Sequence, residues 1–168
     1  MLYFIYSNLS IFKKGADEME IFVDADASPV KKEIIEVAGD FDLPVTLVAS
    51  VAHHSTAELP ANARQIYLDS SPEAVDYKIV QLAEPGDLGI TQDYGLASLL
   101  LGNKVYILHH SGRQISADNI DYLLARRHYS AQARQAGVKT KGPPAFTAED
   151  RRCFKRALND FLSRHLSQ

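Results

Sequence analysis

Short apolar runs alternate along this chain with longer stretches in which apolar residues recur every three or four positions. The runs have the length of strands buried on both faces, and the longer stretches have the period of amphipathic helices. Strands are predicted at residues 21–23, 45–49, 65–68, 88–91 and 104–108, and helices at 29–38, 71–82, 96–101, 115–136 and 147–162. Alternation at such short intervals predicts an α/β domain, with a mostly parallel sheet and helices on both faces.

Capping signals mark several of the predicted helix ends. Ser28 is a plausible N-cap with Pro29 in the first helical position, and Gly39 is a natural stop for that helix. Asp118 is a plausible cap for the helix at 115–136. The segment 147–150, Thr-Ala-Glu-Asp, has the form of a capping box and predicts the start of the last helix.

The length of 168 residues suits one domain, and 46% hydrophobic residues with 23% charged residues is an ordinary globular balance. The single cysteine, Cys153, excludes an intramolecular disulfide and a multi-cysteine zinc site, and it fits a reducing compartment. Residues 1–18 include an apolar stretch that is too short to span a bilayer and lacks the charge order of a secretory signal. We therefore predict an appendage at 1–18, a domain at 19–168 and a cytoplasmic location without membrane contact.

The formal net charge is −3, so the strongly basic footprint of many nucleic-acid-binding proteins is absent. Basic residues are nevertheless crowded into the last third of the chain. They are Arg126, Arg127, Arg134, Lys139, Lys141, Arg151, Arg152, Lys155 and Arg156. A solvated helical face is the usual explanation of such a crowd, and a basic surface beside an acidic site is the alternative.

Aspartates follow two of the predicted strands. Asp24 and Asp26 come after the first strand, and Asp93 comes after the fourth. Ligands of open α/β sheets bind beyond the carboxyl ends of the strands, so these carboxylates converge if the two strands are neighbours. Converging carboxylates repel one another unless a cation lies between them, and hard oxygen ligands suit Mg²⁺ or Mn²⁺. Helix capping is the competing explanation for Asp26 and Asp93.

Four other residues are candidates for substrate binding, because they are predicted to lie near the same crevice. Lys31 and Lys32 occupy the first turn of a helix and could contact phosphate, although a solvated pair is the default. Ser28 and Thr91 are near the crevice if the strands are neighbours, with capping and strand packing as their ordinary roles. Asp87, after Gly86, is most simply a turn residue.

Several motifs, in the same order, resemble the YaiI/YqxD family of uncharacterised bacterial proteins, over roughly residues 20–162. These are Asp24-Ala-Asp-Ala-Ser-Pro-Val-Lys31, Leu43-Pro-Val-Thr-Leu-Val-Ala49, Gly86-Asp-Leu-Gly-Ile-Thr-Gln-Asp93 with Leu96-Ala97, Asp118-Asn-Ile120, and Lys141-Gly-Pro-Pro144 with Phe146, Asp150, Arg151 and Phe154. The family usually has cysteine where this chain has Ser28, which weakens any mechanism that needs a thiol there.

The resemblance implies a Rossmann-type, three-layer fold similar to PIN-like domains, which include metal-dependent ribonucleases with clustered acids at strand ends. The acid pattern carries over to Asp24 and Asp93, and extends by analogy to Asp26 and Asp76. We hypothesise an Mg²⁺- or Mn²⁺-dependent hydrolase of phosphodiesters, with RNA as the partner, in which Asp24 and Asp93 hold the metal. Asp26 would complete the metal shell or orient the attacking water, and Asp76 would be an outer acid.

Two other functions remain open on the sequence. A metal- or RNA-binding module without turnover would keep the same aspartates, and the sequence does not separate it from a nuclease. An aspartate-nucleophile phosphatase is suggested by the Asp-x-Asp of Asp24 and Asp26 after a strand. Such enzymes also need a Gly-Asp pair after a later strand, whereas Gly86-Asp87 precedes the predicted strand here.

Overall fold

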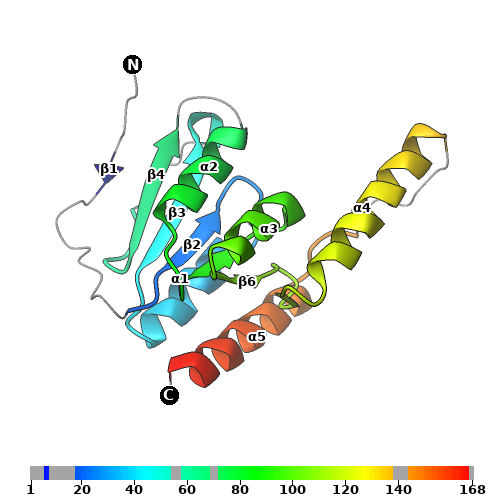
Figure 1. Ribbon diagram of the computed structural model, residues 1–168. Helices are drawn as coiled ribbons and strands as arrows, with labels where there is room; N and C mark the ends of the chain where they lie inside the picture. The colour runs from blue at the N-terminus through cyan, green and yellow to red at the C-terminus, as the bar shows by residue number, and fades with distance from the viewer. Residues whose placement is uncertain (1–5, 8–17, 54–57, 69–71, 138–143, 167–168) are drawn as a thin grey trace.

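The computed structural model describes residues 6–7, 18–53, 58–68, 72–137 and 144–166. Within these residues one seven-stranded sheet runs in the order β1-β4-β3-β2-β5-β6-β7. The five inner strands are parallel, and the two edge strands are antiparallel to their neighbours (Figure 1). The strands are β1 (Tyr6–Ser7), β2 (Ile21–Asp24), β3 (Val45–Ser50), β4 (Ala63–Leu68), β5 (Leu88–Ile90), β6 (Tyr106–Leu108) and β7 (Gln114–Ile115).

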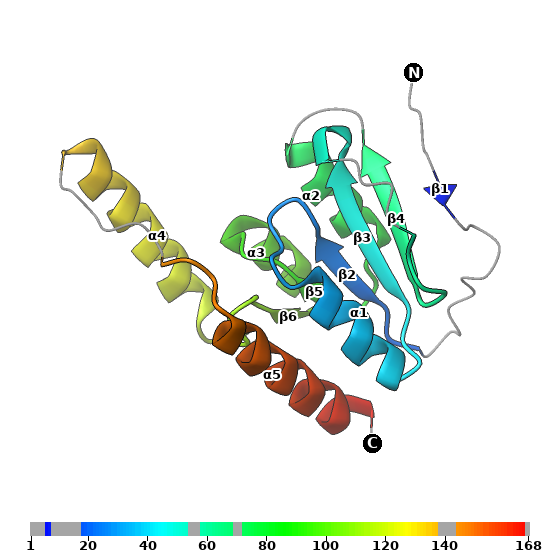
Figure 2. The same ribbon diagram turned by 180° about the vertical axis from the view of Figure 1, so that it is seen from behind.

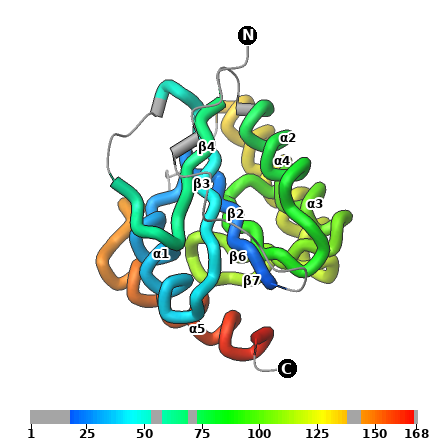
Figure 3. Tube along the Cα trace, turned by 90° about the vertical axis from the view of Figure 1, so that its left-hand side faces the viewer, coloured from blue at the N-terminus to red at the C-terminus, as the bar shows by residue number. Residues whose placement is uncertain are grey.

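Helices cover both faces of the sheet. Two of them, α1 (Lys31–Asp40) and α5 (Ala148–Leu166), lie together on one face (Figure 2). The other face carries α2 (Pro72–Leu82) and α3 (Tyr94–Gly102), with α4 (Ile120–Gln135) packed beside α3 (Figures 1 and 3). A short 3₁₀ helix, η1 (Val51–His53), follows β3. The predicted three-layer α/β domain with a mostly parallel sheet is thereby confirmed.

The sheet separates two hydrophobic cores because successive strand residues point to opposite faces. Ile21 and Val23 of β2 pack in the core below α1 and α5, whereas Phe22 packs in the core below α2 and α3. Gly89 in β5 packs closely against α3. A Cβ atom there would lie 2.9 Å from the Leu100 side chain, so the absence of a side chain allows this packing.

Asp87 fixes the amino ends of β2 and β5. Its side chain is buried and accepts hydrogen bonds from the backbone amides of Glu20, at 2.9 Å, and Glu84, at 2.8 Å. The predicted turn residue is therefore also a link between two chain segments that start adjacent strands.

The predicted start and stop of α1 are both wrong in detail. Ser28 is not the N-cap of α1, because that helix begins at Lys31 with Val30 in the cap position. Arg151 of α5 instead donates to the Pro29 carbonyl and pairs with Glu33, so a tertiary contact holds the start of α1. Gly39 does not end α1, which continues to Asp40.

The helix predicted at 115–136 is shorter than expected. Gln114 and Ile115 form β7, antiparallel to β6, because the left-handed Gly112 (φ 84°) turns the chain back and Ile115 enters the core. The helix begins at Ile120, with Asn119 and not Asp118 in the cap position.

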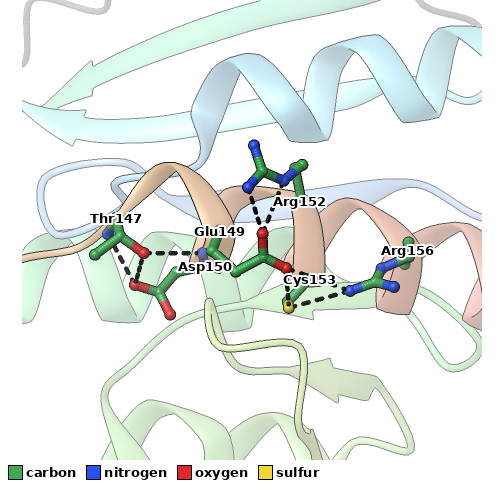
Figure 4. Close-up of polar contacts among 6 residues, drawn as sticks. All are labelled: Thr147, Glu149, Asp150, Arg152, Cys153 and Arg156. Carbon is green, nitrogen blue, oxygen red and sulfur yellow. Dashed lines mark hydrogen bonds and ion pairs between the residues drawn. The ribbon is translucent and has the colours of Figure 1, made fainter.

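The predicted capping box at the start of α5 is confirmed (Figure 4). The Thr147 amide donates to the Asp150 carboxylate at 2.8 Å, and the Asp150 amide donates to the Thr147 hydroxyl at 3.2 Å. In the same first turn, Glu149 pairs with Arg152 and Arg156 of the following turns, and Cys153 lies exposed beside them.

No helix within the described part of the chain is long and apolar enough to cross a membrane. Residues 6–7 of the predicted appendage pair with β4, and the division at residue 18 stays a prediction. Ser71, Lys139, Lys141 and Gly142, which the sequence analysis singled out, lie outside the described residues.

Candidate functional site

The carboxyl ends of β2 and β5 form a crevice at the centre of the sheet. These strands are parallel neighbours, as the convergence of the aspartates requires. The chain leaves β2 toward α1 on one face and leaves β5 toward α3 on the other. Such a divergence is the switch point at which open α/β sheets bind their ligands.

An open pocket of about 1230 Å³ lies at this crevice. Four acids line it, of which Asp24, Asp26 and Asp93 follow strands and Asp76 comes from α2. The opposite wall is α4, which contributes Leu123, Arg126, Arg127, Ser130 and Arg134. The structure therefore brings together all four predicted acids and faces them with arginines.

Asp24 is half-buried at the end of β2. Burial raises the pKa of its carboxyl group, and the negative charges of Asp26 and Asp93 raise it further. The hydroxyl of Thr91 donates to Asp24 Oδ2 at 3.3 Å, which opposes this rise in pKa. A hydrogen bond from the Ala27 backbone also lowers the pKa of Asp24, so two hydrogen bonds favour the ionised form while burial and the neighbouring charges disfavour it.

Asp76 is the most perturbed acid of the pocket. Burial is the largest cause that raises its pKa, to about 6, and the charges of Asp93, Asp24 and Glu73 add to it. An acid on the second turn of a helix is usually a solvated surface residue with an ordinary pKa. The fold instead places Asp76 against the other carboxylates, where a bound cation would relieve the repulsion.

Asp93 has a structural role in addition to its place in the pocket. Its Oδ1 accepts from the amides of Gly95, at 2.6 Å, and Leu96, at 3.2 Å, so it is the N-cap of α3. Arg127 donates to both carboxylate oxygens of Asp93 at 3.3 Å. Asp93 therefore has the helix-capping role that was the alternative to metal binding, and its carboxylate also forms an ion pair with Arg127.

Asp26 does not cap α1. Both of its carboxylate oxygens accept from the Ser50 amide, at 3.1 and 3.0 Å. This bond fixes the loop after β2 to the end of β3, and it places Asp26 at the side of the pocket near Ser50 and η1.

The donor chemistry of the pocket fits a hard divalent cation. Within the described ranges no three acidic, histidine or cysteine side chains are close enough together to hold an ion on their own. Mg²⁺ commonly binds through one or two carboxylates, with water and substrate phosphate completing its shell. Asp24 and Asp76 suit that arrangement, because burial raises the pKa of both carboxyl groups, an effect that a bound cation would oppose, and neither caps a helix.

None of the four predicted substrate-binding residues lines the pocket. Thr91 is buried and joins two acids, since its oxygen donates to Asp24 and accepts from the Asp93 amide at 3.0 Å. Ser28 accepts from the Val30 amide at 3.4 Å and lines a small neighbouring hollow with Thr91. Lys31 and Lys32 are exposed on α1, and Lys31 donates to the Ala25 carbonyl at 3.1 Å.

The arginines of the pocket are not distinguished in the sequence from the other basic residues of the last third of the chain. Arg151, Arg152, Lys155 and Arg156 all lie on α5 and pair with acids there or on α1. Arg126, Arg127 and Arg134 line the pocket. Their helical spacing within the predicted helix at 115–136 was the only signal that could have grouped them. The sequence did not show that this helix lies beside the acids.

Comparison with known proteins now adds the family. The model of a family described as "Uncharacterized BCR, YaiI/YqxD family" matches residues 22–164. The chain belongs to the YaiI/YqxD family. The predicted resemblance is therefore confirmed, and all four acids of the pocket lie within the matched region.

Relatives with the name UPF0178 protein cover nearly the whole domain. One from Bacillus cereus strain AH187 is 51% identical over 146 residues, which are 87% of this chain and 100% of the relative. One from Enterococcus faecalis strain V583 is 51% identical over 148 residues, 88% of this chain and 100% of the relative. One from Bacillus thuringiensis subsp. konkukian is 52% identical over 144 residues, 86% of this chain and 99% of the relative. No solved structure gives a significant match.

Proposed function

We propose that this YaiI/YqxD protein is a divalent-metal-dependent phosphodiesterase that acts on RNA. The observation that supports the proposal most directly is that one open pocket is lined by Asp24 and Asp76 and also by three arginines of α4. These arginines are Arg126, Arg127 and Arg134. Carboxylates with raised pKa values are suited to a cation, and arginines are suited to the phosphate that such a cation would share. The similarity of the family to PIN-like nucleases is an additional reason to expect this chemistry.

Each residue of the pocket has a role in this proposal. Asp24 and Asp76 would hold Mg²⁺ or Mn²⁺, and Asp93 caps α3 beside them in the same pocket. When bound, the ion neutralises charge on the phosphodiester and makes water a stronger nucleophile. Thr91 orients Asp24, and Arg126 and Arg134 hold substrate phosphate. Asp26, which bonds to the end of β3, is left as a positioning residue at the rim.

A metal- or RNA-binding module without turnover is the second candidate. The oxygens of Asp26 and one oxygen of Asp93 already accept backbone hydrogen bonds, so fewer carboxylate oxygens remain to position an attacking water. An aspartate-nucleophile phosphatase is less well supported. The Gly86-Asp87 pair that would serve it lies at the amino end of β5, where Asp87 is buried at the opposite end of the strand from the pocket.

Metal binding is tested by isothermal titration of Mn²⁺ into wild type, Asp24→Asn, Asp76→Asn and the control Asp160→Asn. Asp160 is an exposed acid of α5, so its variant removes the same charge far from the pocket. We expect the two pocket variants to bind Mn²⁺ at least about ten-fold more weakly than wild type and the control to match wild type. Equal binding by all four proteins would refute the metal site.

Turnover is tested separately with end-labelled single-stranded RNA and DNA, incubated with Mn²⁺ or with EDTA. Cleavage that requires Mn²⁺ and is lost in Asp24→Asn is the expected result. Mn²⁺ binding without cleavage of either polymer would refute the phosphodiesterase and favour the binding module. A phosphorylated Asp24 trapped from a small phosphate ester would instead favour the phosphatase.

A further inference from the structure

Helix α4 is largely exposed, although it forms one wall of the pocket. Its only buried residues among those described are Ile120 and Leu123, both in the first turn. Figures 1 and 2 show the rest of the helix projecting away from the body of the domain. Because the later turns of α4 contain no fully buried residue, they contribute little to the core, and their exposed residues are available for another role.

One face of α4 is a row of arginines directed at the acids. Leu123, Arg127, Ser130 and Arg134 recur at helical spacing and line the pocket, with Arg126 beside them. Arg127 pairs with Asp93 and so ties α4 to the amino end of α3. Arg126 and Arg134 are exposed, and neither has an ion-pair partner within the part of the chain that the structure describes.

The neighbouring face of α4 carries two exposed tyrosines. Tyr122, Arg126 and Tyr129 lie at positions i, i+4 and i+7 and therefore share one stripe of the helix. The tyrosine side chains are 66% and 69% exposed, respectively. Aromatic rings interleaved with cations are the surface on which single-stranded nucleic acids bind, because bases stack on the rings while phosphates contact the cations.

We propose that α4 binds the backbone and bases of a single-stranded polynucleotide and leads the strand into the pocket. Arg126 and Arg134 contact phosphates three to four nucleotides apart, and Tyr122 and Tyr129 stack on bases. The two arginines are separated by about 12 Å along the helix axis, which is roughly the length of three to four stacked nucleotides. The inference rests on the proposed function for the chemistry at the acids. It adds that α4 is the element that makes a single-stranded polymer the substrate.

The dimensions and charge of the site favour a polymer over a small phosphate ester. The pocket volume of about 1230 Å³ exceeds the range typical of small-molecule sites, and residues of α4 from Leu123 to Arg134 line the pocket. A duplex keeps its bases stacked inside, out of reach of Tyr122 and Tyr129. A single strand is therefore the form that can use both the arginines and the tyrosines.

Binding is measured by fluorescence anisotropy with short labelled oligouridine, oligothymidine and a blunt duplex, in EDTA. EDTA prevents metal-dependent cleavage, so the measurement does not depend on the proposed activity. We expect both single strands to bind more tightly than the duplex. In Arg126→Gln/Arg134→Gln the dissociation constant should rise at least about ten-fold. The slope of log K against log salt should become less steep by about 1.4, because each single-strand phosphate contact contributes about −0.7 to it and two contacts are lost.

Matched variants distinguish this role from a general effect of charge or aromatic surface. Arg152→Gln/Arg164→Gln removes two exposed charges from α5, on the other face of the sheet, and should bind as wild type does. Tyr122→Ala/Tyr129→Ala should weaken binding about ten-fold or more without changing the salt slope. Its control is Tyr77→Ala, which removes a tyrosine that is 72% exposed on α2.

Three results would overturn the inference: no binding of either single strand, duplex binding as tight as single-strand binding, or equal losses in the α4 and α5 double variants. A wild-type protein that cleaves RNA while its Arg126→Gln/Arg134→Gln variant binds normally would refute the role of α4 and leave the proposed function intact. Strand binding that depends on α4 without any cleavage would refute the proposed phosphodiesterase and leave the role of α4 intact. Preference for oligouridine over oligothymidine would assign the strand to RNA.

Discussion

Replacement of Asp76 by asparagine should stabilise this protein at neutral pH. Asp76 is ionised at pH 7 although its surroundings disfavour the charge, chiefly through burial and secondarily through Asp93 and Asp24. The pKa rises from 3.8 to about 6 in the folded protein. Asparagine has a similar shape and no charge, so Asp76→Asn removes the unfavourable electrostatic energy and leaves the packing of α2 unchanged.

The size of the gain follows from the rise in the Asp76 pKa. If Asp76 were fully shielded from water, the rise would correspond to about 3 kcal/mol of lost stability. The side chain is partly exposed, and solvent screening reduces the value to about 1 kcal/mol. Below the unfolded-state pKa of 3.8 the carboxyl is protonated in both states and the cost vanishes. The cost grows as pH rises from there and is complete above about pH 6.

Urea unfolding of wild type and Asp76→Asn is the appropriate assay, at a pH above 7 and again near pH 3. We expect the variant to be about 1 kcal/mol more stable at the higher pH and equal to wild type at the lower pH. Asp160→Asn, which removes an exposed charge from α5, should leave the free energy of unfolding unchanged at both. An Asp76→Asn protein no more stable than wild type above pH 7 would refute the electrostatic account of this pocket.

Two further predictions concern acids that the structure uses as hydrogen-bond acceptors. Asp93→Ala should lower the free energy of unfolding by about 1–2 kcal/mol because α3 loses its cap, whereas Asp93→Asn, which keeps an acceptor, should lose less than about 0.5 kcal/mol. Equal losses in a urea titration would contradict the capping role. Asp87→Ala should cost about 3 kcal/mol because it leaves the buried amide of Glu20 and the part-buried amide of Glu84 without their acceptor. The exposed Asp118→Ala should cost under about 0.5 kcal/mol by the same assay, and a similar loss in both would show that the Asp87 bonds do not stabilise the fold.

The ends of the strands could be predicted well because their signals are local. The run Ile21-Phe22-Val23 and the aspartate after it are adjacent in the sequence, and the structure ends β2 at Asp24. The capping box at Thr147 likewise involves groups within one helical turn. The two-residue strand β7 was missed because a pair of residues has no detectable periodicity, and only its pairing with β6 makes it a strand.

The sequence by itself determined the α/β class, the family and the strand-end positions of Asp24 and Asp93, since these follow from short-range patterns and motifs. Only the tertiary structure decided which groups surround them. In the fold, β2 lies beside β5, and Asp76 of α2 lines the same pocket as Asp24. Both carboxylate oxygens of Asp26 accept from the Ser50 amide, and the arginines of α4 line the pocket with the acids. The physical reason is that burial and charge–charge interaction depend on distance in space, and the groups that perturb Asp76 most strongly come from strands and loops far from it in the chain.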